Sequence, residues 1–251
     1  MQDRTSELRL AEVLVETTDT LDDDFDPERH LGRVAGHCVE LLAAAAAGVI
    51  VDGSGNCPVS LGGHPQDLAL ALLGAQQSGG PCVESFGSGL PVPPVRLAAP
   101  EPAARWPEFT ALARRHGIGV TYAVPLRQRA TVLGALNVFV PETSLAPHTD
   151  GELRLAQALA DAAAVGLHNH RAYTQYRTLA TQLQGALTSR IRIEQAKGIL
   201  AERWRTDLDE AFDVLRRYAR RERLVMQVVA TEVIKGSLDD AALRGSWSEP
   251  S

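Results

Sequence analysis

Five arginines crowd together near the C-terminal end of the chain, and their chemistry is the most distinctive in the sequence. They lie within a stretch of eight residues, as Arg216, Arg217, Arg220, Arg221 and Arg223. On a helix two pairs of them would be i,i+4 neighbours, and such like-charged pairs each destabilise an isolated helix by a few tenths of a kcal/mol. Guanidinium groups bind phosphates in bidentate fashion and stack on bases. The crowding therefore favours an anionic partner; the alternative is a solvated face on which Asp213 offsets one pair.

Histidines elsewhere in the chain do not have the spacing of a metal site. His168 and His170 form a His-x-His pair, but side chains at i and i+2 of a helix point apart, so they are not expected to share a metal ion. His37, beside Cys38 on an apparent amphipathic helix, and His116, at the end of another, fit packing or capping roles better than ligand roles. We predict no metal site and no catalytic residues.

The three cysteines argue against both disulfides and thiol chemistry. Cys38, Cys57 and Cys82 form no close pair, and an odd number without a signal peptide is not typical of a disulfide framework. Each is expected to be a small buried hydrophobe. Reductases of free methionine sulfoxide use clustered cysteines, whereas these are scattered, so an enzyme of that kind is not expected.

Charge divides the chain into segments of opposite sign. The chain has 251 residues, 45% of them hydrophobic, which suits one large and one small domain, and its net charge is −6. Counted by segment, residues 1–173 carry −8, residues 174–236 carry +4 and residues 237–251 carry −2. Such asymmetry is typical of an acidic body with a basic contact module.

Hydropathy gives no sign of a membrane or export segment. The first residues contain no apolar core of a signal peptide, and no run of about 18 apolar residues occurs. We therefore expect a cytoplasmic protein without a membrane partner.

The first half of the chain reads as a mixed domain built around an antiparallel sheet. Polar–apolar periodicity predicts helices over 5–20, 27–42, 66–77 and 106–115. It predicts strands over 48–51, 57–61, 82–86, 96–98, 117–126 and 131–141, with a Gly/Pro-rich loop over 86–95. The mixture and the first hairpin favour an α/β domain with a central antiparallel sheet.

A long helix follows, from Pro147, which suits the first turn of a helix. Its approximate heptad stripe comprises Ala156, Leu159, Ala163, Gly166, His170 and Tyr173, and restarts one residue short at Tyr176, Ala180, Leu183 and Leu187. The pattern is compatible with a parallel two-stranded linker, in which about 40 helical residues would span roughly 60 Å. The alternative is a helix that packs one face back on its own domain.

Three short helices are expected over 191–204, 208–221 and 224–235. Asp207 suits the N-cap of the second, with Glu210 placed for the reciprocal capping-box bond. Apolar residues at helical spacing form its expected buried stripe, namely Ala211, Phe212, Leu215 and Ala219.

The stretches "IEQAKGIL", "DEAFDVLRRYAR" and "VVATEVI" resemble the ANTAR family over about 187–235, although Ala201 stands where many members carry Met. The resemblance implies a three-helix RNA-binding module of bacterial antiterminators, acting as a dimer on two stem-loops of nascent RNA. By resemblance, the framework would comprise Ile193, Ala196, Leu200, Ala211, Phe212, Leu215 and Ala230. The expected RNA contacts are basic residues at or near motif positions: Lys197, Arg203, Arg216, Arg217 and Arg220.

The stretches "LLAAAAAGVIV", "WPEFTALARRHGIGVTYAVPL" and "LGALNVF" resemble the GAF domains of actinobacterial proteins that couple them to this module. That resemblance covers about Leu8 to Arg171 and implies an antiparallel sheet between helices, which senses a small molecule or dimerises. No cofactor is identified, and any small-molecule ligand is unknown.

Together these features predict a homodimeric, RNA-binding transcription antitermination regulator that is not an enzyme. The expected parts are a GAF sensor domain (1–146), a coiled-coil-like linker helix (147–186), an all-α ANTAR domain (187–236) and a flexible tail (237–251). Two alternatives stay open: a DNA-binding regulator that uses the same arginines, and a GAF-mediated protein scaffold that binds no nucleic acid.

Overall fold

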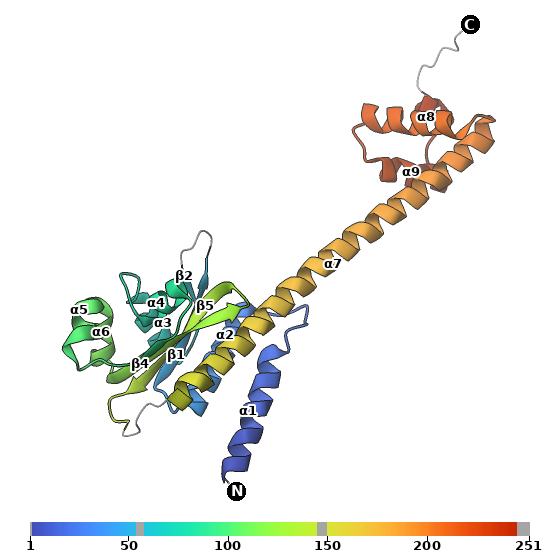
Figure 1. The fold of residues 1–251 in the computed structure, drawn as a ribbon. Helices are drawn as coiled ribbons and strands as arrows, with labels where there is room; N and C mark the ends of the chain where they lie inside the picture. Colours follow the sequence, from blue (N-terminus) through green and yellow to red (C-terminus); the bar gives the residue numbers. More distant parts are fainter. Residues whose placement is uncertain (1, 54–57, 145–149, 245–251) are drawn as a thin grey trace. The chain divides into compact units, whose positions relative to one another are not determined.

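The computed structural model describes residues 2–53, 58–144 and 150–244 (Figure 1). Cys57 and Pro147, to which the sequence analysis assigned roles, lie outside these residues. The chain divides into two compact units, Met1–Tyr173 and Thr174–Ser251. Among the described residues, no helix is both long enough and apolar enough to cross a membrane.

The first unit is built on a five-stranded sheet that is antiparallel throughout. Its strands are β1 (Ala46–Asp52), β2 (Pro58–His64), β3 (Val92–Arg96), β4 (Ile118–Gln128) and β5 (Thr131–Pro141). Their order across the sheet is β2-β1-β5-β4-β3. The central pair, β4 and β5, consists of long Val- and Ala-rich strands buried on both faces. The predicted α/β domain with an antiparallel sheet is confirmed.

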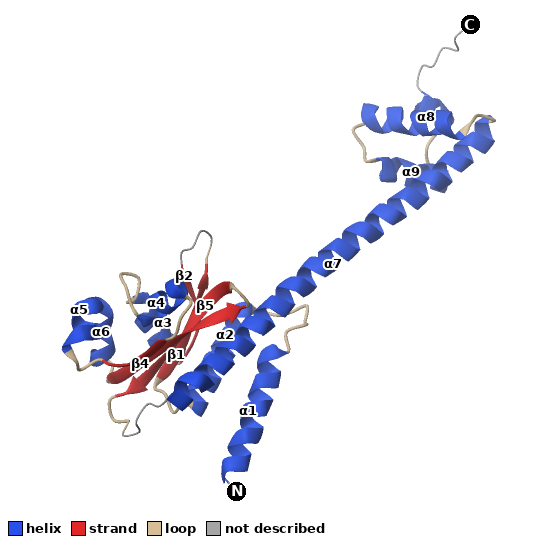
Figure 2. Ribbon diagram, viewed as in Figure 1, coloured by secondary structure: helices blue, strands red, loops and turns tan. Residues whose placement is uncertain are grey.

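Helices cover both faces of this sheet (Figure 2). One face packs against α1 (Gln2–Thr18), α2 (Pro27–Leu41) and the first part of α7 (Asp150–Trp204). The other packs against α3 (Gln66–Gly74), α4 (Pro81–Ser88) and α6 (Pro107–Arg115), while the short α5 (Pro100–Arg105) packs against α6. The two-residue period of β5 sends Leu136 and Val138 to the first core and Ala135 and Phe139 to the second. The sheet is thus the middle of three layers.

Two predictions for the segment between β2 and β4 are wrong. Residues 82–86, expected to form a strand, belong to helix α4, which begins with Pro81 at its first turn and ends at the left-handed Gly89. Its buried residues, Cys82, Ser85 and Phe86, recur at helical spacing. The short strand expected at 96–98 lies earlier, at β3, and the proline-rich α5 was not predicted.

Helix α7 runs unbroken from Asp150 to Trp204, so the predicted linker and the predicted first short helix of the module are one helix. Its glycines, Gly166, Gly185 and Gly198, are tolerated in the helix without a break. Ala156, Leu159 and Ala163 are fully buried against the sheet. At these positions the helix packs on its own domain, which was the alternative to a two-stranded linker.

The acidic connection between α1 and α2 clamps α7. Thr20 Oγ1 donates a hydrogen bond of 2.7 Å to the carbonyl oxygen of Gly166, and His170 Nδ1 lies 3.2 Å from the carbonyl oxygen of Thr20. Phe25 stacks on His170 with ring centroids 4.3 Å apart, and Tyr173 donates a 3.0 Å hydrogen bond to the Asp23 carboxylate. The last turns of α7 within this unit are therefore fixed to α1 and α2.

Gly166→Ala should weaken this clamp although alanine is the better helix former. A Cβ atom at Gly166 would lie 2.5 Å from the Thr17 carbonyl oxygen, whereas a Cβ atom at Gly185 of the same helix would meet open space. We expect Gly166→Ala to cost about 1–3 kcal/mol through overpacking and the control Gly185→Ala to be neutral or stabilising by up to ~1 kcal/mol. Urea denaturation followed by circular dichroism measures both. Equal stability of the two variants would contradict the clamp.

The second unit consists of the end of α7 with α8 (Leu208–Arg221), α9 (Met226–Lys235) and α10 (Asp240–Arg244). Its core is a single cluster of buried side chains: Ala196, Leu200, Ala211, Val214, Leu215, Ala219, Val229, Ala230, Val233 and Leu243. The expectation of a flexible tail over 237–251 is wrong for its described part, because α10 forms there and buries Leu243, which is only 2% exposed.

Candidate nucleic-acid interface

Helix α8 carries four of the five clustered arginines, all but Arg223, and is held by its cap and its buried face. Asp207 accepts a 2.7 Å hydrogen bond from the Glu210 amide, as the capping pattern predicts. The expected return bond of the capping box, from the Asp207 amide to the Glu210 side chain, is replaced. The Glu210 carboxylate instead accepts a hydrogen bond from the Thr206 hydroxyl. Ala211, Leu215 and Ala219 are buried, so the remaining face of the helix is turned to solvent.

Arg216 and Arg220 lie one turn apart on the exposed face of α8. In the described chain neither forms an ion pair, and Asp213 does not offset them as the solvated-face alternative supposed. Two like charges at this spacing repel each other. The face therefore presents two guanidinium groups whose donors are available to an anion.

Two of the predicted RNA contacts are instead engaged inside the unit. Lys197 forms a 3.0 Å ion pair with Glu194, has a side chain only 13% exposed and lies 5.5 Å from the centre of the Phe212 ring. Arg203 forms a 2.8 Å ion pair with Asp240, and the nearby Trp204 side chain together with this guanidinium lowers the pKa of the Asp240 carboxyl. The structure therefore does not bring these two together with Arg216 and Arg220 on one open face.

The residues expected to form the framework are buried in the core with two exceptions. Ile193 packs against the core cluster but is only partly buried. Phe212 is half-buried, lies outside the cluster and contacts Lys197 through its ring face, which corrects its expected place in the buried stripe. The others are members of the cluster: Ala196, Leu200, Ala211, Leu215 and Ala230.

Arg217, the remaining predicted contact, lines a cavity of about 250 Å³ beside the turn between α7 and α8. Two further arginines that the sequence analysis did not select, Arg205 and Arg244, line the same cavity. Arg244 lies over the Trp204 ring at 4.5 Å. Arg205 could have been noticed as a charged residue two positions before the cap, but nothing near Arg244 in the sequence indicated its place.

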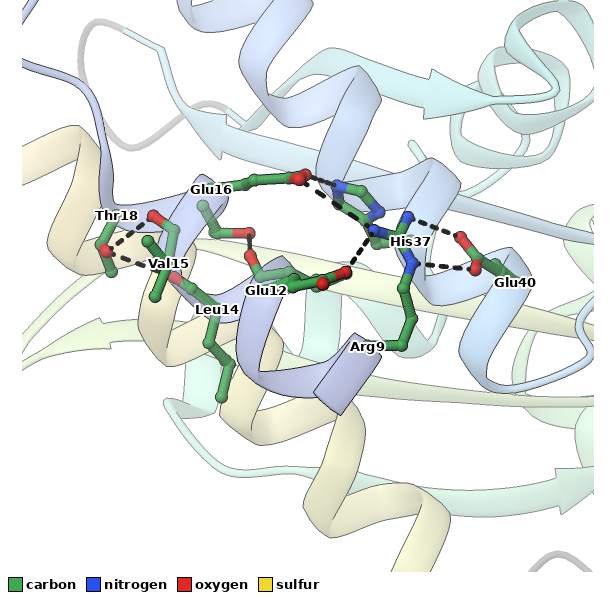
Figure 3. A network of polar contacts seen from close by, with 10 residues as sticks. Arg9, Glu12, Leu14, Val15, Glu16, Thr18, His37 and Glu40 are labelled. Carbon is green, nitrogen blue, oxygen red and sulfur yellow. Dashed lines mark hydrogen bonds and ion pairs between the residues drawn. The ribbon is translucent and has the colours of Figure 1, made fainter. Parts of the chain in front are cut away.

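In the first unit, a network of polar contacts joins α1 to α2 (Figure 3). Arg9 forms a bidentate pair with Glu40, with donor–acceptor distances of 3.1 and 3.2 Å, and also approaches Glu12 and Glu16. His37, half-buried, lies 3.4 Å from Glu16, and burial is the main cause that lowers its pKa. His37 thus belongs to a helix-to-helix contact.

An open groove of about 650 Å³ borders this network. Its lining combines the basic side chains of Arg29, Arg33 and His64 with the helix glycines Gly32 and Gly36. Among described residues no ion pair satisfies Arg29 or Arg33. The groove is a candidate ligand site of the first unit; its lining also includes Glu40, which is paired with Arg9, so the other two arginines give it a charge that suits an anionic small molecule.

The described cysteines and histidines do not form a reactive or metal-binding site. Cys38 and Cys82 are fully buried on opposite faces of the sheet; burial raises the pKa of the Cys38 thiol to about 12 and also raises that of Cys82. Among the described residues, no group of three or more His, Cys, Asp and Glu side chains could hold a metal ion. His116 is the C-cap residue of α6.

Comparison with protein families matches both units. The family model for the GAF domain matches residues 26–167, and that for the ANTAR domain matches residues 181–234. No curated protein matches the chain.

Similar solved structures are GAF domains. The second GAF domain of DevS from Mycobacterium smegmatis is 20% identical, with 61% of this chain and 99% of that chain covered and a TM-score of 0.43. The GAF domain of a phosphoenolpyruvate-protein phosphotransferase from Coxiella burnetii is 16% identical, with 67% and 98% covered and a TM-score of 0.46. The phycocyanobilin-bound GAF domain of a cyanobacterial phytochrome is 12% identical, with 65% and 96% covered and a TM-score of 0.48.

Proposed function

Because the chain belongs to the GAF-domain family and carries an ANTAR domain after it, we propose that it is a transcription antitermination regulator whose ANTAR domain binds paired stem-loops in nascent RNA. GAF and ANTAR domains are sensor and regulatory domains, and here the GAF domain controls the ANTAR domain. Stabilising an antiterminator hairpin over a terminator hairpin requires only binding.

The observation that carries the RNA proposal is the exposed pair Arg216 and Arg220 on α8. No carboxylate of the described chain neutralises these guanidinium groups. Within an acidic protein of net charge −6, the segment 174–236 carries +4. A phosphate backbone supplies the missing negative charge, and planar guanidinium groups match phosphate oxygens in bidentate fashion.

We propose that a second copy of the chain packs against the exposed apolar stripe of α7. Tyr176, Leu183 and Leu187 are 73%, 62% and 52% exposed, and Ala180 continues their heptad spacing. The stripe leads to a shallow groove of about 670 Å³ with Ile199 and Ile234 in its lining. Pairing two α7 helices in parallel would bury these side chains and give two RNA-binding faces, so that two linked hairpins bind with a gain in effective concentration.

Control by the sensor would pass through the clamp on α7. The contacts of Thr20 and Phe25 with Gly166 and His170 tie the helix to α1 and α2. Arg9 and His37, which join α1 to α2, also line the basic groove. An anionic ligand that binds the groove more tightly in one arrangement of α1 and α2 would shift the population of that arrangement, and with it the register of the paired helices.

A binding titration tests the function. Purified protein is titrated with a paired-hairpin RNA, a single hairpin and duplex DNA of equal length, at two salt concentrations. Tighter binding of the paired hairpin than of the other two supports the proposal. Preference for duplex DNA would replace it by a DNA-binding regulator, and no salt-dependent binding of any nucleic acid would leave a GAF-mediated protein scaffold.

Replacing Arg216 and Arg220 together by alanine should weaken hairpin binding by at least about tenfold, because hydrogen bonds to charged groups contribute about 1.5–3 kcal/mol each. The dependence of affinity on salt concentration should also become less steep, because each arginine that contacts a phosphate contributes about one to the slope. The measurement is the slope of the logarithm of the affinity against the logarithm of salt concentration. The matched control is Arg114→Ala with Arg115→Ala, which removes the same charge from exposed positions of α6. Equal effects of the two double variants would contradict the interface.

A further inference from the structure

The cavity beside the turn between α7 and α8 has the composition of an anion site. It measures about 250 Å³, and its lining includes the guanidinium groups of Arg205, Arg217 and Arg244. Glu210 is the carboxylate in this lining, and it already accepts the hydrogen bond of the Thr206 hydroxyl. Three positive groups therefore surround one small space with one carboxylate among them.

Neighbouring arginines show that the unit neutralises its cations where it can. Arg203 forms an ion pair with Asp240 at 2.8 Å, and Arg221 forms one with Glu222 at 2.8 Å. Among described residues, no ion pair is made by Arg205, Arg217 or Arg244. Guanidinium groups around one cavity repel each other, which is unfavourable. An anion in the cavity would offset this repulsion by attracting each of them.

Helix α10 fixes the wall that carries Arg244. Leu243 is buried in the core at 2% exposure, Asp240 pairs with Arg203, and the carbonyl oxygen of Ala242 accepts a 2.5 Å hydrogen bond from Arg221. Stacking over Trp204 orients the Arg244 guanidinium. This helix lies beyond residues 181–234, which the ANTAR family model matches, so the family resemblance does not account for it.

The opposite wall is also set by the backbone. Arg205 directly follows the last residue of α7 and adopts a left-handed conformation with φ of +53°, which turns the chain into the α8 cap. Arg217 belongs to α8 itself, and Arg220 follows it at i+3, a spacing that makes the two side chains neighbours on the helix surface. The cavity therefore lies beside the exposed face of Arg216 and Arg220, and a ligand that crosses that face can reach it.

We propose that Arg205, Arg217 and Arg244 form a phosphate pocket that holds a backbone phosphate of the RNA bound at the neighbouring face of α8. This inference rests on the proposed RNA-binding function and adds a second contact region, completed by α10. Bidentate guanidinium groups suit the oxygens of a phosphate diester, and the cavity is larger than one phosphate, which leaves room for part of the attached sugar.

The test compares Arg244→Gln with Arg223→Gln in hairpin RNA titrations at several salt concentrations. Both variants remove one arginine charge from the same unit, but Arg223 is exposed and does not line the cavity. We expect Arg244→Gln to weaken binding several-fold and to reduce the salt slope by about one contact, with a smaller change for Arg223→Gln. Arg205→Gln removes an arginine from the opposite wall of the pocket and should weaken binding as Arg244→Gln does. It gives an independent result if the loss of Arg244 loosens α10.

A competition arm separates an RNA phosphate from free phosphate. Inorganic phosphate is added at constant ionic strength, with chloride as the reference anion. If the pocket takes a phosphate, inorganic phosphate should weaken RNA binding by the wild-type protein more than binding by Arg244→Gln. If the wild-type protein binds RNA but the affinities of Arg205→Gln and Arg244→Gln equal that of Arg223→Gln, the pocket alone is overturned. Failure of the wild-type protein to bind any hairpin would overturn the proposed function and the pocket together.

Discussion

Leu215→Ala should destabilise the ANTAR domain by about 2–5 kcal/mol, the usual cost of emptying a buried leucine site. Leu215 is fully buried at the centre of α8 and packs with residues of α7 and α9 in one cluster. A unit this small has little other core to compensate for the cavity. Hydrogen exchange measured by peptide gives the result, with faster exchange expected over 208–235 and unchanged exchange over β4 and β5 of the GAF domain.

Phe212→Ala is the matched control in the same helix. The Phe212 ring is half-buried and lies outside the core cluster, so its loss should raise exchange less than the loss of Leu215, despite the larger side chain removed. A greater effect of Phe212→Ala would show that the ring supports the domain in a way that its burial does not indicate.

Acidification should destabilise the GAF domain through His30. This side chain is 2% exposed, its Nε2 has no hydrogen-bond partner among the described residues, and burial, followed by the nearby charges of Arg33 and His37, lowers its pKa to about 4. The unfolded chain, with a pKa of about 6.5, then binds the proton more readily. The free energy of unfolding should therefore fall as pH drops from about 6.5 to about 4, by about 3 kcal/mol in total.

Urea denaturation at a series of pH values measures this loss, and His30→Phe should remove most of it. The lowered pKa of His37 acts in the same direction and leaves a residual slope. The Glu40 carboxyl, whose pKa is lowered by Arg9, contributes stability that is lost only at more acidic pH. His168→Phe, at an exposed position of α7, should keep the wild-type acid sensitivity because His30 is still present. Identical pH profiles for His30→Phe and the wild-type protein would refute the assignment.

Local sequence patterns were sufficient for much of the fold of both domains. The apolar runs of β4 and β5 and the cap at Asp207 are read from neighbouring residues, and the structure has them where the patterns predict. Cys82–Phe86 is too short for its period to separate a strand from a helix. The decisive signals were the flanking Pro81 and Gly89, which mark the first turn and the left-handed end of α4.

The candidate site was less predictable because its charges are paired over long separations. Asp240, the partner of Arg203, lies 37 residues away in sequence, and Lys197 is occupied by Glu194 and Phe212 once the helices pack. A count of basic residues in the sequence does not separate such paired side chains from those that remain unpaired. The pocket of Arg205, Arg217 and Arg244 depends on the packing of α10 through Leu243, which the sequence analysis assigned to a tail.

The continuity of α7 also orders events during synthesis. One apolar face of the GAF sheet stays partly uncovered until residues as far as Leu167 have left the ribosome, because Ala156, Leu159 and Ala163 complete the core that α1 and α2 begin. The core of the ANTAR domain begins much further along the same helix, at Ala196, and takes its remaining contacts from residues close in sequence. The sensor core can thus be complete before the effector core starts to form, and a ribosome that stalls before α7 would leave part of the sheet uncovered and prone to aggregation.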